Sequence, residues 1–321
     1  MKKNKTDEIN KPIDQKTLFG FDSYFIFFEK LIQNGRLPNS IMLSGQKGTG
    51  KATFIYHFIN FLLSKNEENK YDRKNFSINH NSSSYKLIKS GTHPNLFFLD
   101  SLNDENIKIE QIRKLLLFLN KSAYNDGIKI VLLDNAEHLN INSSNALLKA
   151  IEEPTFNTYF FIINNDSKKI LNTIKSRCID FKINFNLKEK RNIFYKISNE
   201  YDLNFVESDL DNFLYFDTHG NFLKYLSALN GSKIDESNNY LSCIDHFMNL
   251  YIEKNDPKIL NYLSVFIQSF YNRLSLKNSQ LIANYHRNLY KILYLIRDMK
   301  TFHLDKKNLF FSIDKIIKNE R

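Results

Sequence analysis

The chain has 321 residues, 42% of them hydrophobic, which is enough to bury a sizeable core divided over two or three domains. Its two cysteines, Cys178 and Cys243, exclude a disulfide framework and a four-cysteine zinc site, and no apolar run approaches the roughly 18 residues of a membrane span. The formal charge of +10 favours a polyanionic partner, but abundant Lys, Asn, Ile and Phe also fit AT-rich codon usage.

The first residues are basic and lack the apolar stretch of a secretory signal. We therefore expect a cytoplasmic protein in which residues 1–15 form a flexible tail.

The first elements expected along the chain are a strand, a glycine-rich loop and a helix. Residues 41–45 form a short apolar run that ends in Gly45, and apolar side chains recur at helical spacing over residues 54–63. Between them, Gly45, Gly48, Gly50 and Lys51 match the phosphate-binding loop G-x-x-x-x-G-K-[ST]. Its glycines let backbone N–H groups surround the phosphates, and its lysine reaches the β and γ phosphates.

The loop departs from its pattern at one position. Ala52 stands where a hydroxyl normally ligates magnesium. Thr53 comes one residue later, which rotates its hydroxyl by about 100° round the helix. We therefore expect weakened metal binding; the alternative is a glycine turn that only precedes a core helix.

The middle of the chain alternates between predicted strands and helices. Residues 64–91 are polar and predict a surface excursion of low order. Apolar runs predict strands at 95–100, 128–134 and 158–165, and periodic segments predict helices at 107–120 and 145–154. Ser143 or Ser144 is expected to cap the second of these helices. This alternation predicts an α/β fold with a mostly parallel sheet covered on both faces, and beyond about residue 185 we expect only amphipathic helices.

The end of the third predicted strand carries residues that bear on hydrolysis. Asp134 ends the strand where a Walker B aspartate would hold magnesium through water, although it could be a simple strand-end turn residue. The next position, acidic in hydrolysing enzymes, is Asn135, and an amide cannot act as a general base. Glu137 could substitute only with a rearranged geometry. The sequence thus retains a loop that can surround phosphates. It lacks two parts needed for ATP hydrolysis, namely the hydroxyl at position 52 and the acidic side chain at position 135.

Arg177 follows a predicted helix and is flanked by the small residues Ser176 and Cys178. In phosphoryl transfer, an arginine donated by a neighbouring subunit offsets charge on the transferred phosphate. Chemistry alone also allows an ordinary surface or ion-pair arginine.

Three motifs together carry a family resemblance: "RLPNSIMLSGQKGTGKAT", "LLDNAEHLNINSSNALLKAIEEP" and "SRC". Their order and spacing resemble the AAA+ clamp-loader subunits of bacterial DNA polymerase III and, within them, the delta prime family. The match is good over residues 18–180 and weaker for "THGNFLKYLSAL" and "FHLDKKNLFFSIDKI". The resemblance implies an AAA+ P-loop domain over 16–184, a small helical lid domain over 185–231 and an all-helical collar domain over 232–321.

The resemblance also implies a function. Such a subunit is a non-hydrolysing member of a hetero-pentameric ring, with gamma/tau and delta subunits, the sliding clamp and primer-template DNA as partners in DNA replication. Arg177 in the SRC motif would be an arginine finger acting in trans on a neighbouring ATPase subunit. The chain would have no independent enzymatic activity and would belong to the polymerase holoenzyme.

The same resemblance implies a degenerate nucleotide site made by Gly45, Gly48, Gly50, Lys51, Thr53, Asp134, Asn164 and Lys224. Asn164 and Lys224 fall on the sensor positions, and an arginine is usual at the second. No cofactor is expected to be required, and ATP with magnesium is expected to bind weakly at most. A cysteine-bound zinc module is also not expected, because the segment after Leu63 lacks cysteine.

Two alternatives stay open at this point. The first is the ATP-hydrolysing, gamma/tau-like motor subunit of the same loader, which would carry a hydroxyl at position 52 and an acid at 135. The second is a small-molecule P-loop kinase, whose lid would need several arginines.

Overall fold

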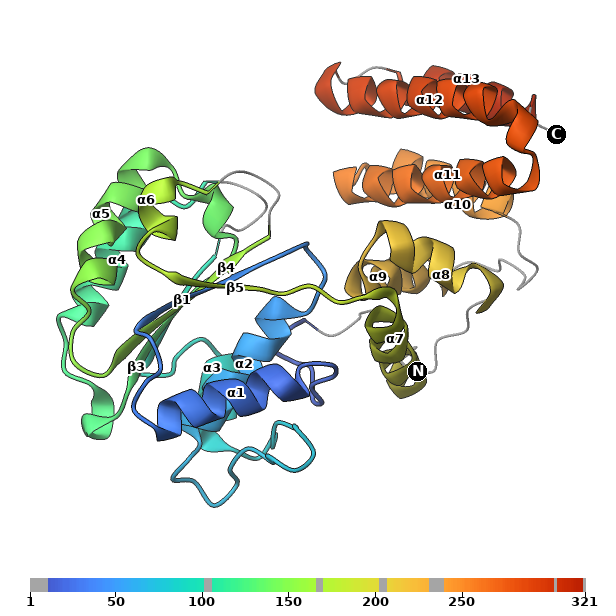
Figure 1. Cartoon of the computed structure of the whole chain (residues 1–321). Coiled ribbons are helices and arrows are strands. Elements are labelled where there is room, and N and C mark those ends of the chain that lie inside the picture. The colour runs from blue at the N-terminus through green and yellow to red at the C-terminus, as the bar shows by residue number, and fades with distance from the viewer. Residues whose placement is uncertain are drawn as a thin grey trace. The chain divides into compact units, whose positions relative to one another are not determined.

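The computed structural model describes residues 11–100, 106–165, 170–201, 207–230, 240–302 and 305–319. The chain divides into two compact units (Figure 1). The first comprises Asn10–Ile197 together with Thr218–Gly220, and the second holds Ser198–Asp217 and Asn221–Arg321. The division falls within helix α7 (Leu187–Tyr201) and again around residues 218–220.

The first unit is built on five parallel strands. They are β1 (Ser40–Ser44), β2 (Leu96–Leu99), β3 (Lys129–Leu133), β4 (Thr158–Asn164) and β5 (Ile179–Lys182). Their order in the sheet is β2-β3-β4-β1-β5. In this register Ser44 lies beside Asn164 of β4 and Lys182 of β5, so the carboxyl ends of the central strands meet at one edge. The predicted parallel sheet is confirmed, and β5 is an additional strand that the apolar patterns did not predict.

Helices cover both faces of this sheet (Figure 1). Their bounds are α1 (Asp22–Gln33), α2 (Lys51–Leu63), α3 (Ser83–Lys89), α4 (Ile109–Leu119), α5 (Ile141–Glu152) and α6 (Asn172–Lys175). Alternate residues of a strand point to opposite faces. Accordingly, Ile41 and Leu43 join the cluster under α1, α2 and α3, whereas Met42 joins the cluster under α4, α5 and α6.

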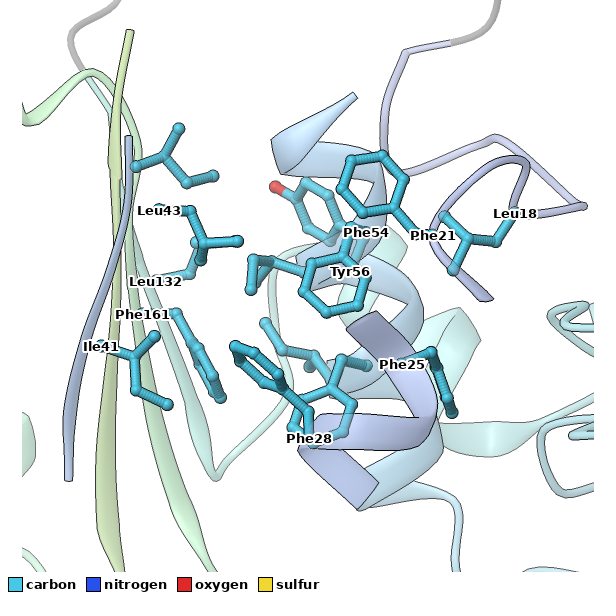
Figure 2. Close-up of a cluster of buried hydrophobic side chains, with 14 of the residues drawn as sticks. Leu18, Phe21, Phe25, Phe28, Ile41, Leu43, Phe54, Tyr56, Leu132 and Phe161 are labelled. Atoms are coloured by element: carbon cyan, nitrogen blue, oxygen red, sulfur yellow. The ribbon is translucent and has the colours of Figure 1, made fainter. Parts of the chain in front are cut away.

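The cluster under α1 and α2 is rich in phenylalanine (Figure 2). Phe54 of α2 stacks on Phe21 with ring centroids 5.0 Å apart and meets Phe28 of α1 edge to face at 5.3 Å. All three side chains are fully or almost fully buried. Because Phe54 lies three residues after Lys51, this packing fixes the start of α2 and hence the end of the glycine-rich loop.

The segment at 64–91 folds against this cluster, so the prediction of a surface excursion of low order is wrong. It contains α3, and four of its apolar side chains are buried: Tyr71, Ile78, Tyr85 and Ile88. Glu67 accepts hydrogen bonds of 2.8 Å from the Ser82 hydroxyl and from the backbone N–H of Ser83, which fixes the start of α3. These apolar residues are too widely spaced to give a periodic pattern.

Two further local predictions concern the cap of α5 and the N-terminal tail. The cap of α5 is Asn140, whose side chain accepts a 2.8 Å hydrogen bond from the Ser143 N–H, so the prediction of a serine cap is wrong. Ser143 instead donates its hydroxyl to the carbonyl of Ile107 at 2.7 Å. Of the predicted tail, residues 1–10 lie outside the described residues. At its described end the Gln15 carbonyl lies 3.1 Å from Nε2 of the buried His57.

The described part of the second unit contains helices throughout. They are α8 (Glu207–Phe216), α9 (His219–Asn230), α10 (Tyr240–Lys254), α11 (Pro257–Lys277), α12 (Ile282–Phe302) and α13 (Lys306–Lys318), with the first residues of α9 assigned to the first unit. Aspartates cap α11 and α13, where Asp256 and Asp305 accept from backbone N–H groups two residues on. Phe266 lies 5.0 Å from Phe213 and 5.1 Å from Phe247, between ring centroids, in an aromatic core.

The α/β unit followed by helices confirms the predicted fold class. The predicted lid–collar boundary at 231/232 lies outside the described residues, and the domain bounds stay predictions. No helix within the described ranges is long and apolar enough to cross a membrane.

Candidate nucleotide-binding site

The glycine-rich loop joins β1 to α2, as the sequence predicts. Gly45, Gly48 and Gly50 have φ angles of +147°, +88° and +91°, which disfavour any side chain. A Cβ at Gly45 would lie 2.4 Å from the carbonyl oxygen of Ile183, so this position has no room for one either. The loop conformation therefore requires these glycines.

Lys51 is enclosed by the loop that precedes it, with 2% of its surface exposed. Its Nζ donates to the carbonyl oxygens of Gly45 at 2.6 Å and Gln46 at 2.8 Å. The backbone of the loop thus supplies acceptors for the ammonium group. A bound phosphate would have to compete with these carbonyls.

Residues 218–220 pack directly on the loop. The Thr218 hydroxyl donates to the Lys47 carbonyl at 2.9 Å, and the Gly220 N–H donates to the Gly48 carbonyl at 3.1 Å. A Cβ at Gly220 would lie 2.4 Å from the same Gly48 oxygen, so the contact requires glycine. Sequence reasoning did not pair these segments, although Gly220 opens the "GNFLKYL" stretch.

The first turn of α2 carries the departure from the loop pattern. Ala52 and Thr53 are both half-buried, and Ala52 packs against the phenylalanine-rich cluster. The methyl group at position 52 therefore contributes to apolar packing, where a hydroxyl would normally ligate magnesium. The hydroxyl of Thr53 follows on the next helical position.

Asn135 stands directly after the Walker B position, and its amide is engaged at both ends. Its Nδ2 donates to an Asp100 carboxylate oxygen at 2.6 Å, and its Oδ1 accepts from Asn165 Nδ2 at 2.9 Å. Its backbone N–H donates to Asp134 at 2.8 Å from a left-handed conformation with φ +55°. The nearby Glu137 is buried and accepts from the Asn165 backbone N–H at 3.1 Å.

This network joins the ends of β2, β3 and β4, and sequence reasoning missed Asp100 and Asn165. Their signal was present, since each is the last residue of a predicted strand. Burial, and next the neighbouring Asp100 carboxylate, raise the pKa of Asp134 to about 6, with a smaller contribution from Glu137 and an opposing one from Lys51.

Replacing Asp134 by Asn should stabilise the chain at neutral pH. A folded-state pKa near 6, above the ordinary aspartate value near 4, makes the folded state lose stability as pH rises from about 4 to 6. Asparagine removes this loss, so we expect the free energy of unfolding to rise by about 2–3 kcal/mol at pH 7.5 and to change little at pH 4. Urea unfolding at both pH values measures the difference. An equal gain at both would contradict the electrostatic cause.

The sensor-position residues lie in different places. Asn164 ends β4 beside β1, is buried, and its carbonyl accepts from the Gly45 N–H at 3.3 Å, so it adjoins the loop. Lys224 is an exposed residue of α9 in the second unit, whereas the loop belongs to the first. Its predicted part in the site stays a prediction.

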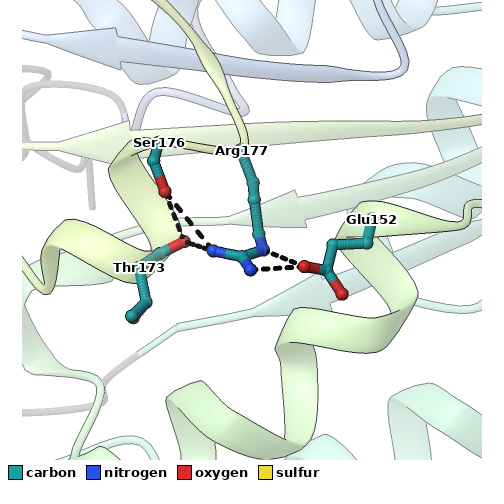
Figure 3. A network of polar contacts seen from close by, with 4 residues as sticks. All are labelled: Glu152, Thr173, Ser176 and Arg177. Atoms are coloured by element: carbon teal, nitrogen blue, oxygen red, sulfur yellow. Dashed lines mark hydrogen bonds and ion pairs between the residues drawn. The ribbon is translucent and has the colours of Figure 1, made fainter.

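Arg177 lies between α6 and β5, and its guanidinium contacts its own chain (Figure 3). Nε and Nη2 both pair with Glu152 Oε1, and Nη1 donates to the Thr173 carbonyl at 2.8 Å. The side chain is 32% exposed.

The sheet separates Arg177 from the glycine-rich loop of the same chain. Arg177 precedes β5, whereas Gly45 follows β1, its parallel neighbour, and Ile179 is level with Ile41. Arg177 is therefore level with about residue 39, and the six residues from there to Gly45 span about 20 Å of extended strand. That is beyond the reach of an arginine side chain, so Arg177 cannot serve its own loop.

The sheet order, the loop between β1 and α2 and the aspartate after β3 define a P-loop domain of the AAA+ type. A solved structure, a DNA polymerase III gamma subunit-related protein from Thermotoga maritima, shares this fold with a TM-score of 0.51 and 18% identity, covering 92% of this chain and 99% of that one. At that identity the likeness shows the fold alone.

Sequence comparisons add the family. The model of the family described as DNA polymerase III, delta subunit, matches residues 22–186. The chain is 42% identical over 95 residues to DNA polymerase III subunit delta' of Pseudomonas aeruginosa, covering 29% of each protein. It is 29% identical over 247 residues to that of Buchnera aphidicola subsp. Baizongia pistaciae, covering 74% of this chain and 69% of the relative. The chain belongs to the DNA polymerase III delta subunit family, among relatives named delta prime, which confirms the resemblance.

Proposed function

We propose that the chain is a clamp-loader subunit of DNA polymerase III that does not hydrolyse ATP and supplies Arg177 to a neighbouring ATPase subunit. The family match and the relatives named delta prime support membership of the loader. The proposed partners are gamma/tau and delta subunits, the sliding clamp and primer-template DNA. The proposed domains are those expected from the resemblance: P-loop domain 16–184, lid 185–231 and collar 232–321.

The observation that carries the absence of hydrolysis is the bonding of Asn135. An amide accepts no proton at neutral pH, and this one donates to Asp100 while accepting from Asn165. It therefore cannot act as the base that activates a water, and these two hydrogen bonds hold its amide within the network at the strand ends. Ala52 removes the magnesium-ligating hydroxyl, and the carbonyl acceptors around Lys51 compete with a phosphate.

The observation behind a role in trans is the position of Arg177. It is partly exposed at the end of the sheet opposite its own loop, on a short connection between α6 and β5. An arginine that cannot reach its own phosphate site is still available to another subunit. Arginine donated in this way accelerates phosphoryl transfer by roughly 10³ to 10⁵.

ATP turnover by the purified full-length chain tests the absence of hydrolysis. We expect no magnesium-dependent phosphate release above the rate without protein. Lys51→Ala is the matched control, because it removes the phosphate-binding ammonium group, and a contaminating ATPase would be unaffected by it. Magnesium-dependent turnover that disappears in Lys51→Ala would make the chain a motor subunit and contradict the proposal.

A further inference from the structure

Glu152 is the counter-ion of Arg177 within the chain (Figure 3). One Glu152 oxygen pairs with both Nε and Nη2, while Nη1 donates to the Thr173 carbonyl at 2.8 Å and lies 3.3 Å from the Ser176 hydroxyl. A guanidinium has five N–H donors. Four contacts within the chain therefore engage the guanidinium of Arg177, the group that is proposed to act on a neighbouring subunit.

The local fold explains this pairing. Glu152 is the last residue of α5, where a carboxylate faces the negative end of the helix dipole and benefits from a cation beside it. The single turn of α6 packs against α5 and ends just before Arg177. The arginine side chain folds back over this turn to reach both the Thr173 carbonyl and Glu152 (Figure 3).

The pairing is also exposed enough to exchange. Glu152 is 44% exposed and Arg177 32% exposed, so water reaches both partners. An exposed ion pair of this kind changes the equilibrium between its closed and open forms by about 1.5- to fivefold. A phosphate that binds an arginine usually takes two parallel N–H donors, and such charge-assisted pairs are stronger than exposed carboxylate pairs.

From these contacts we infer that Glu152 is a positioning residue that keeps Arg177 folded on its own subunit until a neighbour's nucleotide displaces it. The inference rests on the proposed function of Arg177 as a finger in trans. With the Glu152 pair intact, too few guanidinium donors remain for a two-point phosphate contact, so the pair must open before the finger engages. Glu152 therefore lowers the basal hydrolysis of the loader and leaves the fully engaged state unchanged.

The test compares the assembled loader carrying the wild-type chain, Glu152→Gln or Glu153→Gln. Glu153 is the exposed neighbouring carboxylate at the same helix end, so its variant removes the same charge without touching the pair. We expect Glu152→Gln to raise the basal ATPase rate by about 1.5- to fivefold while the rate with clamp and primed DNA stays unchanged. Glu153→Gln should alter neither rate. An unchanged or lower basal rate in Glu152→Gln would overturn the inference, and a structural defect would lower both rates.

A second readout on the full-length chain alone keeps this test separate from the proposed function. The Nε–H signal of Arg177 in ¹⁵N-labelled chain is assigned by its loss in Arg177→Lys. We expect slow hydrogen exchange of this signal in the wild type and faster exchange in Glu152→Gln, with Glu153→Gln unchanged. Equal exchange in all three chains overturns the inference. If Arg177→Ala leaves loader hydrolysis intact while the exchange difference is present, the proposed function fails and the Glu152 contact stands.

Discussion

Replacement of Phe54 by alanine is expected to lower the free energy of unfolding by about 3–5 kcal/mol, because it empties the centre of the phenylalanine-rich cluster. The ring is fully buried and lies against Phe21, Phe28 and Phe58 at centroid distances of 5.0, 5.3 and 6.3 Å. Neighbouring rings held by two helices and a sheet cannot collapse fully into the vacated space. Urea denaturation of the full-length chain, followed by tyrosine fluorescence, measures the loss.

Phe156→Ala is the matched control, since it removes the same side chain from a position that is 90% exposed. We expect it to change the free energy of unfolding by less than about 0.5 kcal/mol. A loss below about 1 kcal/mol for Phe54→Ala, or equal losses for the two variants, would show that the cluster does not anchor α2.

The strands that line the site were predictable because they are buried on both faces. β1 and β3 are fully buried and contain the apolar runs 41–43 and 130–133, and a glycine follows β1 while an aspartate follows β3. β5 gave no such signal, because its "IDFK" sequence is only half apolar and its residues are exposed or half-buried. An edge strand of this kind is defined by its pairing with β1, which only the folded chain provides.

The segment at 64–91 shows the opposite failure of sequence reasoning. Its polar composition predicted low order, yet Tyr71 stacks on Phe25 with ring centroids 5.3 Å apart and donors from Ser82 to Ser84 converge on Glu67. A few anchoring side chains and one carboxylate fix a segment that has little apolar content. Such contacts join residues that are distant in sequence and leave no periodic pattern.

The candidate site was predictable only in the parts that belong to its motifs. The three glycines, Lys51 and Asp134 are where their spacing places them. The bonds of Asn135 to Asp100 and Asn165 depend on strand order, and the contact of Gly220 with Gly48 depends on how distant segments pack. Neither could be derived from spacing along the chain.

Arg177→Ala should slow ATP hydrolysis at the neighbouring site that receives the arginine by roughly 10³- to 10⁵-fold, which corresponds to about 4–7 kcal/mol of transition-state stabilisation. Nucleotide affinity and assembly should change much less, because the finger acts mainly on charge that develops in the transition state. Arg113→Ala is the matched control: Arg113 is exposed on α4, and its loss should leave hydrolysis within error.

We propose that this chain does not hydrolyse ATP and that it provides Arg177 to a subunit that does. One assay series tests it most directly, namely ATP turnover by the chain alone and by the loader with clamp and primed DNA, carrying either the wild-type chain or Arg177→Ala. We expect no turnover by the chain alone and a large loss in the loader that carries Arg177→Ala. Turnover by the chain alone, or full activity of that variant loader, would contradict it.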